Sequence, residues 1–279
     1  ASMGLTEYDQ AVQYFTEALE LSDGWVQNVD YDMNYYLAAA YRKNGQPAEA
    51  KKVYDAILGL KPEEKDAYFL RGSAELELGD YESAKADFDK AISMDPKNYD
   101  RLIEIYEALA DYGYREVGQE YLQNVLDTAK QLDAYDSGRI YYYLGDYQKA
   151  YLALEEAKGK GGVDSYLYLG KAYAATGDYN YASSVYSNYL SKQGPDAEIY
   201  NQLGLCELAK KDYQKALEAF QAGKQIEGNS LMQTLSFNEI VAYEYLQDYQ
   251  KAAVLLNAYL QNYPDDQAAI REQQFLSTR

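Results

Sequence analysis

The chain has 279 residues and a formal net charge of −19, from 26 Lys and Arg against 45 Asp and Glu. This charge argues against nucleic acid and anionic membrane surfaces as partners, because both attract Lys and Arg. Histidine is absent and cysteine occurs once, which removes the commonest general base, the commonest transition-metal ligand and any disulfide within the chain. No apolar run is long enough to predict a membrane-spanning helix.

A pattern of about 34 residues repeats along the chain. In its clearest copy, LGDYESAKADFDKA, a Gly-Asp turn separates two helices, and Ala84, Phe88 and Ala91 lie on one face of the second helix. The residues equivalent to Ala84 are spaced by 39, 34, 34, 32, 32, 34 and 36 positions and are Ala11, Ala50, Ala84, Gly118, Ala150, Ala182, Ala216 and Ala252. Self-similarity at a fixed period predicts a helical repeat architecture.

The first unit, 1–30, begins inside a repeat. Ala11, Phe15 and Ala18 fit a second helix whose first helix is missing, so we expect the natural chain to extend upstream. A longer connection, 22–32, follows and contains Trp25, which could hold this loop against the repeats or contact a partner. The next two units, 31–64 and 65–98, are regular.

The middle of the chain departs from the pattern. Unit 99–130 is degenerate, with Arg115 in place of the usual tyrosine and Gly118 in place of the alanine, and unit 131–162 ends in AKGKGG. These two units are short and are not closed by proline, so we expect a joint between two arrays here. Regular units are then expected at 163–196, 197–232 and 233–266, before a capping helix at 267–279 with Ile270 and Phe275 facing inward.

Two units carry the pattern most completely. They contain Tyr68, Gly72, Tyr81, Ala84, Phe88, Ala91 and Pro96, and Tyr166, Leu169, Gly170, Tyr173, Tyr179, Ala182 and Tyr186. Over residues 1–266 this residue pattern resembles that of the tetratricopeptide repeat family. The resemblance implies an all-α, right-handed superhelical solenoid of about seven to eight antiparallel helix pairs. Small residues such as Gly72, Gly170 and Gly204 then allow close helix crossings that Phe88, Tyr186 and Phe220 fill.

In this family the first helix of each repeat lines a groove that holds partner peptides. The positions that match the family's groove residues are Tyr35, Arg42, Phe69, Ile103, Tyr135, Arg139, Tyr142, Leu167, Lys171, Asn201 and Phe237. This groove is more apolar and aromatic than the Lys- and Asn-rich groove with which some members bind a C-terminal carboxylate. The alternative is that neighbouring repeats cover several of these side chains.

No motif in the sequence indicates catalysis or the binding of a cofactor or metal. A Gly-rich phosphate loop, a metal-ligand spacing and a nucleophile elbow are all missing, so we expect no catalytic residue, cofactor or metal. Acidic residues at 30–32 and 95–100 do not match a calcium loop. Cys206 lies within a predicted first helix, where it could either pack in the core or serve as a reactive thiol.

The sequence therefore predicts a non-catalytic protein-binding scaffold or adaptor, whose partner segment is neutral or basic. Two alternatives remain, a sensor that responds to a peptide or small ligand and the interaction domain of a larger envelope protein. From its acidic, tyrosine-rich composition without histidine, we expect the protein to be bacterial. The expected location is the cell envelope, with the cytoplasm as the alternative. The identity of the partner and the oligomeric state stay open.

Overall fold

The computed structural model describes residues 2–21, 28–160 and 162–278, and every regular element in these ranges is an α-helix. The chain divides into two compact units, residues 1–128 and 129–279. The division falls within 99–162, the stretch for which the sequence predicts a joint. Trp25, which was expected to hold the lengthened loop or contact a partner, lies outside the described residues.

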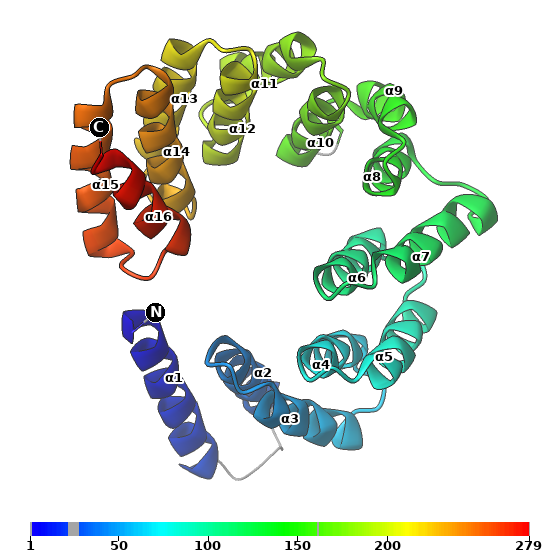
Figure 1. The fold of residues 1–279 in the computed structure, drawn as a ribbon. Helices are drawn as coiled ribbons and strands as arrows, with labels where there is room; N and C mark the ends of the chain where they lie inside the picture. Colours follow the sequence, from blue (N-terminus) through cyan, green and yellow to red (C-terminus); the bar gives the residue numbers. More distant parts are fainter. Residues whose placement is uncertain (1, 22–27, 161, 279) are drawn as a thin grey trace. The chain divides into compact units, whose positions relative to one another are not determined.

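The described residues of unit 1 form a single helix followed by three helix pairs (Figure 1). The single helix is α1 (Ser2–Leu21), and the pairs are α2 (Asn28–Lys43) with α3 (Pro47–Leu60), α4 (Lys65–Glu77) with α5 (Tyr81–Met94), and α6 (Tyr99–Asp111) with α7 (Arg115–Thr128). The degenerate unit at 99–130 is thus a regular helix pair in spite of its altered residues.

In the part of unit 2 that the structure describes, there are four helix pairs and a last single helix. The pairs are α8 (Ala134–Leu144) with α9 (Tyr147–Ala157), α10 (Gly162–Ala175) with α11 (Tyr179–Gln193), α12 (Ala197–Ala209) with α13 (Tyr213–Lys224), and α14 (Met232–Tyr245) with α15 (Tyr249–Asn262), and the last helix is α16 (Gln267–Leu276). In both units the helices that open the pairs are called first helices below, and those that close them second helices.

An aspartate caps the start of five second helices. Its carboxylate accepts a hydrogen bond from the backbone N–H three residues later, for example at 3.0 Å between Asp248 and Lys251, and the five caps are Asp80, Asp146, Asp178, Asp212 and Asp248. The residue before each cap has a positive φ, such as 81° at Gly145. This conformation ends the preceding helix and is accessible to glycine without strain.

Two of the sequence expectations about helix limits and faces are wrong. The loop predicted at 22–32 is shorter, because α2 already begins at Asn28. In α16 the side chains that pack inward are Ala269 and Leu276, at 0% and 6% exposure, whereas Ile270 is half-buried and Phe275 is 40% exposed. The inward face of the cap is therefore set by contact with α15 rather than by the largest apolar residue of the helix.

Candidate functional site

The first helices carry all eleven residues that the sequence assigned to a groove, but the structure exposes them unequally. Ile103, Arg139, Leu167 and Asn201 are buried, with exposures between 4% and 8%. The other seven are partly exposed: Tyr35, Arg42, Phe69, Tyr135, Tyr142, Lys171 and Phe237. The four buried side chains offer little surface to a partner, so a binding face has to be built from the seven others and their neighbours.

In unit 1, the first helices α2 and α4 form an open pocket of about 520 Å³ together with Tyr54 of α3. Its lining residues are Tyr35, Tyr36, Ala39, Arg42, Lys43, Tyr54, Leu70 and Glu77. The structure thus brings the predicted residues Tyr35 and Arg42 together. Tyr36 and Leu70 were missed, although both stand two residues before the small residue at the crossing of their repeat, Ala38 and Gly72. That shared register is the signal that could have found them.

An ion pair crosses one side of this pocket. Arg42 donates from Nε to Oε1 of Glu77 at 2.7 Å, and its Nη2 contacts the same oxygen. Because the two residues belong to successive first helices, the pair joins neighbouring repeats. It also neutralises both charges, so that Lys43 is the remaining charged residue of the lining.

Two of the pocket tyrosines, Tyr35 and Tyr54, stay in the phenol form. Burial raises the pKa of Tyr54 to about 12, although the guanidinium of Arg42 opposes the rise. Burial, together with the carboxylates of Glu64 and Asp66, also raises the pKa of Tyr35, whose hydroxyl donates to Glu64 at 3.4 Å. The rings of Tyr35 and Tyr54 in the pocket wall are therefore neutral, and their hydroxyls can donate hydrogen bonds.

Phe69, the next predicted residue along unit 1, is covered on one face by a cation. The guanidinium carbon of Arg101 lies 4.0 Å from the centre of its ring, and Arg101 also pairs with Asp66 at 2.9 Å. Such a cation over an aromatic face is an attractive contact. A partner that reaches Phe69 therefore meets the ring edge or has to displace Arg101.

In unit 2 a cluster of tyrosines surrounds Tyr142. The centre of its ring lies 5.4 Å from that of Tyr143, 5.7 Å from that of Tyr147 and 5.6 Å from that of Tyr168. The hydroxyls of Tyr143 and Tyr168 are 3.0 Å apart. Nearby, the guanidinium of Arg139 lies 4.3 Å over the ring of Tyr135. All of these tyrosines are partly exposed, so the cluster both packs α8 on α10 and leaves part of its surface open to solvent.

Of the remaining predicted residues, Lys171 and Asn201 contact the next repeat, whereas Phe237 packs within its own repeat. Lys171 pairs with Glu198 at 3.7 Å, and Asn238 donates to Asn201 at 2.8 Å. Phe237 packs against Tyr259 of the following second helix, with ring centres 5.7 Å apart. These contacts hold neighbouring helices together. The position of Asn201 between two first helices accounts for the burial of its side chain.

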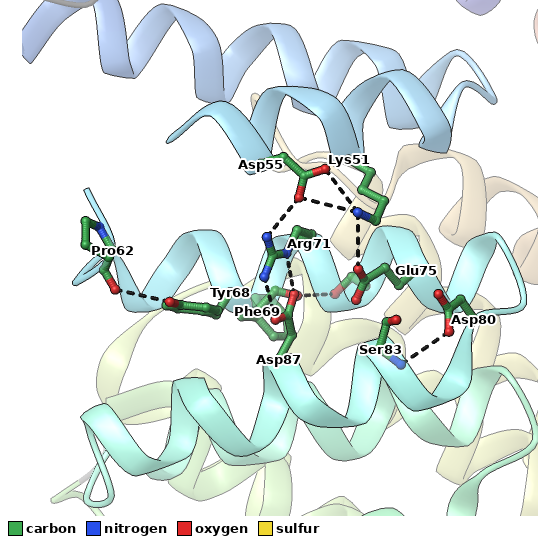
Figure 2. Close-up of polar contacts among 11 residues, drawn as sticks. Lys51, Asp55, Pro62, Tyr68, Phe69, Arg71, Glu75, Asp80, Ser83 and Asp87 are labelled. Carbon is green, nitrogen blue, oxygen red and sulfur yellow. Dashed lines mark hydrogen bonds and ion pairs between the residues drawn. The ribbon is translucent and has the colours of Figure 1, made fainter. Parts of the chain in front are cut away.

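A second polar group lies between α3, α4 and α5 (Figure 2). Arg71 donates to both carboxylate oxygens of Asp87, at 2.6 and 2.8 Å, and to Asp55 at 2.8 Å. Lys51 pairs with Asp55 at 3.0 Å and with Glu75 at 3.6 Å. Glu75 is 3% exposed, and its Oε2 accepts no hydrogen bond. Burial, and secondarily Asp87, raises the pKa of Glu75 to about 7.

Glu75 occupies a repeat position that other units fill with tyrosine. The equivalent residues are Tyr41, Tyr141, Tyr173 and Tyr243, and in the two other complete repeats Leu109 and Glu207. In unit 2, Tyr173 at this position stacks on Tyr151, which stands in the register of Lys51, with ring centres 4.7 Å apart. An ion pair in one repeat thus replaces an aromatic stack in another. We therefore assign the polar group to the packing between repeats.

The single thiol belongs to the core. Cys206 is 3% exposed, and burial raises its pKa to about 12. Of the two roles that the sequence left open, packing is the one that fits.

Among the described residues, no group of three His, Cys, Asp or Glu side chains is placed to hold a metal ion. Within the same ranges, no helix has both the length and the apolar character needed to cross a membrane.

Comparison with known proteins agrees with this geometry. A family model described as tetratricopeptide repeat matches residues 2–58, 35–99 and 167–230, and a second model with the same description matches 237–266. These matches cover more than half of the chain. The chain belongs to the tetratricopeptide repeat family. The models leave residues 100–166 unmatched, which is where the tetratricopeptide pattern is weakest and where the two units divide.

Solved structures share the fold at low sequence identity. A tetratricopeptide repeat protein from Parabacteroides merdae aligns with a TM-score of 0.55 and 15% identity over 85% of this chain and 93% of that one. Yeast Tom70 aligns with a TM-score of 0.60 and 16% identity over 91% of this chain and 61% of that one. A mouse protein described as FK506-binding protein-like is 42% identical over 62 residues, which are 22% of this chain and 18% of the mouse protein. These solved structures support the helical repeat fold, and membership of the tetratricopeptide repeat family supports a scaffold for protein interactions in general.

Proposed function

We propose that this tetratricopeptide array is a non-catalytic scaffold that binds a partner segment along its first helices, with the pocket between α2 and α4 as an anchor. The observation that carries the proposal is the pocket itself. It is open, about 520 Å³ in volume, and lined by three tyrosines, the ion pair of Arg42 with Glu77, and one further cation, Lys43. Such a wall suits a large apolar or aromatic side chain, since aromatic rings give a large contact area at low entropic cost.

The residues around the anchor should be neutral or basic. The whole chain carries a net charge of −19, and the carboxylates of Glu64 and Asp66 lie close to Tyr35 at the edge of the pocket. A basic flank would be attracted over distances of about 10 Å, and raising the salt concentration would weaken binding moderately.

The proposal can be tested by selecting peptides from a random display library on the immobilised chain. We expect enrichment of peptides with a large apolar residue beside Lys or Arg, and fluorescence anisotropy then gives their affinity. Replacing the exposed lining residue Ala39 by Trp fills the pocket without removing a core contact. The variant Ala39→Trp should weaken binding at least about tenfold.

The matched control is Leu152→Trp, because Leu152 is 61% exposed and lies on the second helix α9 of unit 2. This variant should bind the selected peptides as well as the unchanged chain does. Equal affinity of the Ala39→Trp variant and the control would show that the anchor lies elsewhere.

A further inference from the structure

Helix α16 packs on α14 and α15 through a small apolar core. Its residues Ala269 and Leu276 share this core with Ile240 of α14 and with Leu256 and Tyr259 of α15. Beside the core, α15 and α16 leave an open pocket of about 370 Å³ between them. The apolar packing of α16 is therefore incomplete, so that a single polar contact of this helix can affect how firmly it is held.

Such a contact involves Glu244, near the end of α14. Glu244 stands in the register of Arg42, and the residues in this register of the other described pairs are all uncharged: Leu76, Ala110, Tyr142, Ala174 and Leu208. The charge of Arg42 is neutralised by Glu77 of the next first helix. Glu244 also meets a residue of the helix beyond its own pair, but this residue is Glu272 of α16, a second carboxyl group.

The two carboxyl groups lie within hydrogen-bond distance of each other. Oε1 of Glu244 is buried and accepts no hydrogen bond from a protein donor. A carboxylate can only accept, so two ionised side chains cannot form a hydrogen bond here and would repel each other. With one proton between them, one group donates to the other, and the contact becomes attractive.

No positive charge compensates the pair within the described residues. Glu239, the other carboxylate of α14, pairs with Lys224 at 2.6 Å. Lys251 is the only charged residue of α15, and Arg271 is the only other charged residue of α16. None of these groups shifts the pKa of Glu244, and the same holds for the tyrosines of α14 and α15, which are Tyr243, Tyr245, Tyr249 and Tyr259.

Burial raises the pKa of Glu244 from 4.5 to about 7, and the charge of Glu272 and the hydrogen bond to it add to the rise. Below this pH, Glu244 is a carboxylic acid that can donate to the carboxylate of Glu272. When Glu244 ionises, the hydrogen bond is lost and the two charges face each other across the contact of α14 with α16.

We propose that a proton shared by Glu244 and Glu272 fastens α16 to α14, so that α16 separates from the rest of unit 2 more readily at alkaline than at acidic pH. A carboxyl group that binds its proton more firmly in the docked state favours docking fully below about pH 4.5, and this advantage is lost as the pH rises through about 7. Separation of α16 would open the core at Leu256 and Tyr259, which it helps to cover.

The experiment is amide hydrogen exchange of the full chain at several pH values, corrected for the intrinsic exchange rate. The protection of α16 should fall at least about tenfold between about pH 5 and pH 8, whereas that of α12, in the same unit, should change less than about twofold. This comparison needs no variant, so it does not depend on whether a substituted chain folds.

Variants identify the proton that is responsible. Glu244→Gln supplies an amide that donates to Glu272 at every pH, so α16 should stay protected up to pH 8, and Glu272→Gln should have the same effect from the other side. Glu156→Gln, which removes an exposed carboxylate of α9, is the matched control and should keep the fall. Glu75→Gln should also keep it, because Glu75 lies in unit 1.

Equal protection of α16 at pH 5 and pH 8 in the unchanged chain would overturn the proposal. So would an unaltered fall in both glutamine variants, because the shared proton would then not be its cause. A parallel fall in α12 would overturn it as well, since the whole unit would then loosen. Peptide binding to the pocket between α2 and α4 is a separate measurement, and its failure would affect only the proposed function.

Discussion

Gly170 of α10 lies directly against the ring of Tyr186 of α11, because a Cβ on Gly170 would stand only 2.3 Å from Cζ of the tyrosine. Gly204 and Phe220 repeat the relationship in the next pair, also at 2.3 Å. The glycine lets the two helices of a repeat approach, and the aromatic ring fills the space that the missing side chain leaves.

This contact predicts a strong effect of one methyl group. Gly170→Ala should lower the free energy of unfolding by about 1–3 kcal/mol, since the ring of Tyr186 is fully buried and has to move. Gly59→Ala in α3 is the matched control, because a Cβ at Gly59 meets open space. The control should be neutral or stabilise by up to about 1 kcal/mol through helix propensity. The free energies of unfolding of the two variants are compared by urea unfolding, monitored by circular dichroism. Similar losses of stability in both would contradict the packing argument.

A second prediction concerns the turns between paired helices. Gln247 has a φ of 62° at the position where Gly145 has 81°. A left-handed conformation costs a residue with a Cβ about 1–2 kcal/mol, so Gln247→Gly should stabilise the chain by about 1 kcal/mol. Gly145→Gln should destabilise it by a similar amount, although a Cβ there meets no neighbour. Thermal unfolding measures the stability of both variants. A destabilised Gln247→Gly variant would show that the backbone of Gln247 is not strained.

A third prediction follows from the raised pKa of Glu75, about 7 against an ordinary 4.5. A carboxyl with a higher pKa in the folded state holds more proton there than in the unfolded state. Its contribution to stability therefore falls as the pH rises from about 4.5 to about 7. Glu75→Gln should remove this decline and be more stable than the unchanged chain at pH 8, by about 1–2 kcal/mol.

The groups that face Glu75 are Lys51, Arg71, Asp80 and Asp87. The measurement is the free energy of unfolding in urea at several pH values between 5 and 8. Glu82→Gln, at an exposed position of α5, serves as the control and should keep the pH profile of the unchanged chain. If the profile of Glu75→Gln also stays unchanged, the buried carboxyl does not titrate in this range.

A fourth prediction concerns the thiol. Because Cys206 is buried and burial raises its pKa to about 12, little thiolate is present and reagents have poor access. A thiol reagent at pH 8 should label the native chain about a hundredfold more slowly than the chain in concentrated guanidinium. Equally fast labelling of both would mean that the helix α12 opens readily.

The sequence by itself determined the repeat, its helix pairs and the close crossings, because these depend on residues that are near neighbours in the chain. Asp178 and Gly177 specify a turn within three residues, and Gly170 meets Tyr186 within one repeat. The family pattern also placed the first helices correctly. Local spacing carries this information, since the helical period fixes which side chains share a face.

Only the tertiary structure decided which side chains of the first helices are open. Ile103 and Tyr35 hold the same repeat position, yet Ile103 is buried and Tyr35 lines a pocket. The accessibility depends on how side chains of successive repeats meet, as Arg42 meets Glu77 thirty-five residues later. Such pairs differ from one repeat to the next, and the period of the pattern, which describes a single repeat, does not encode them.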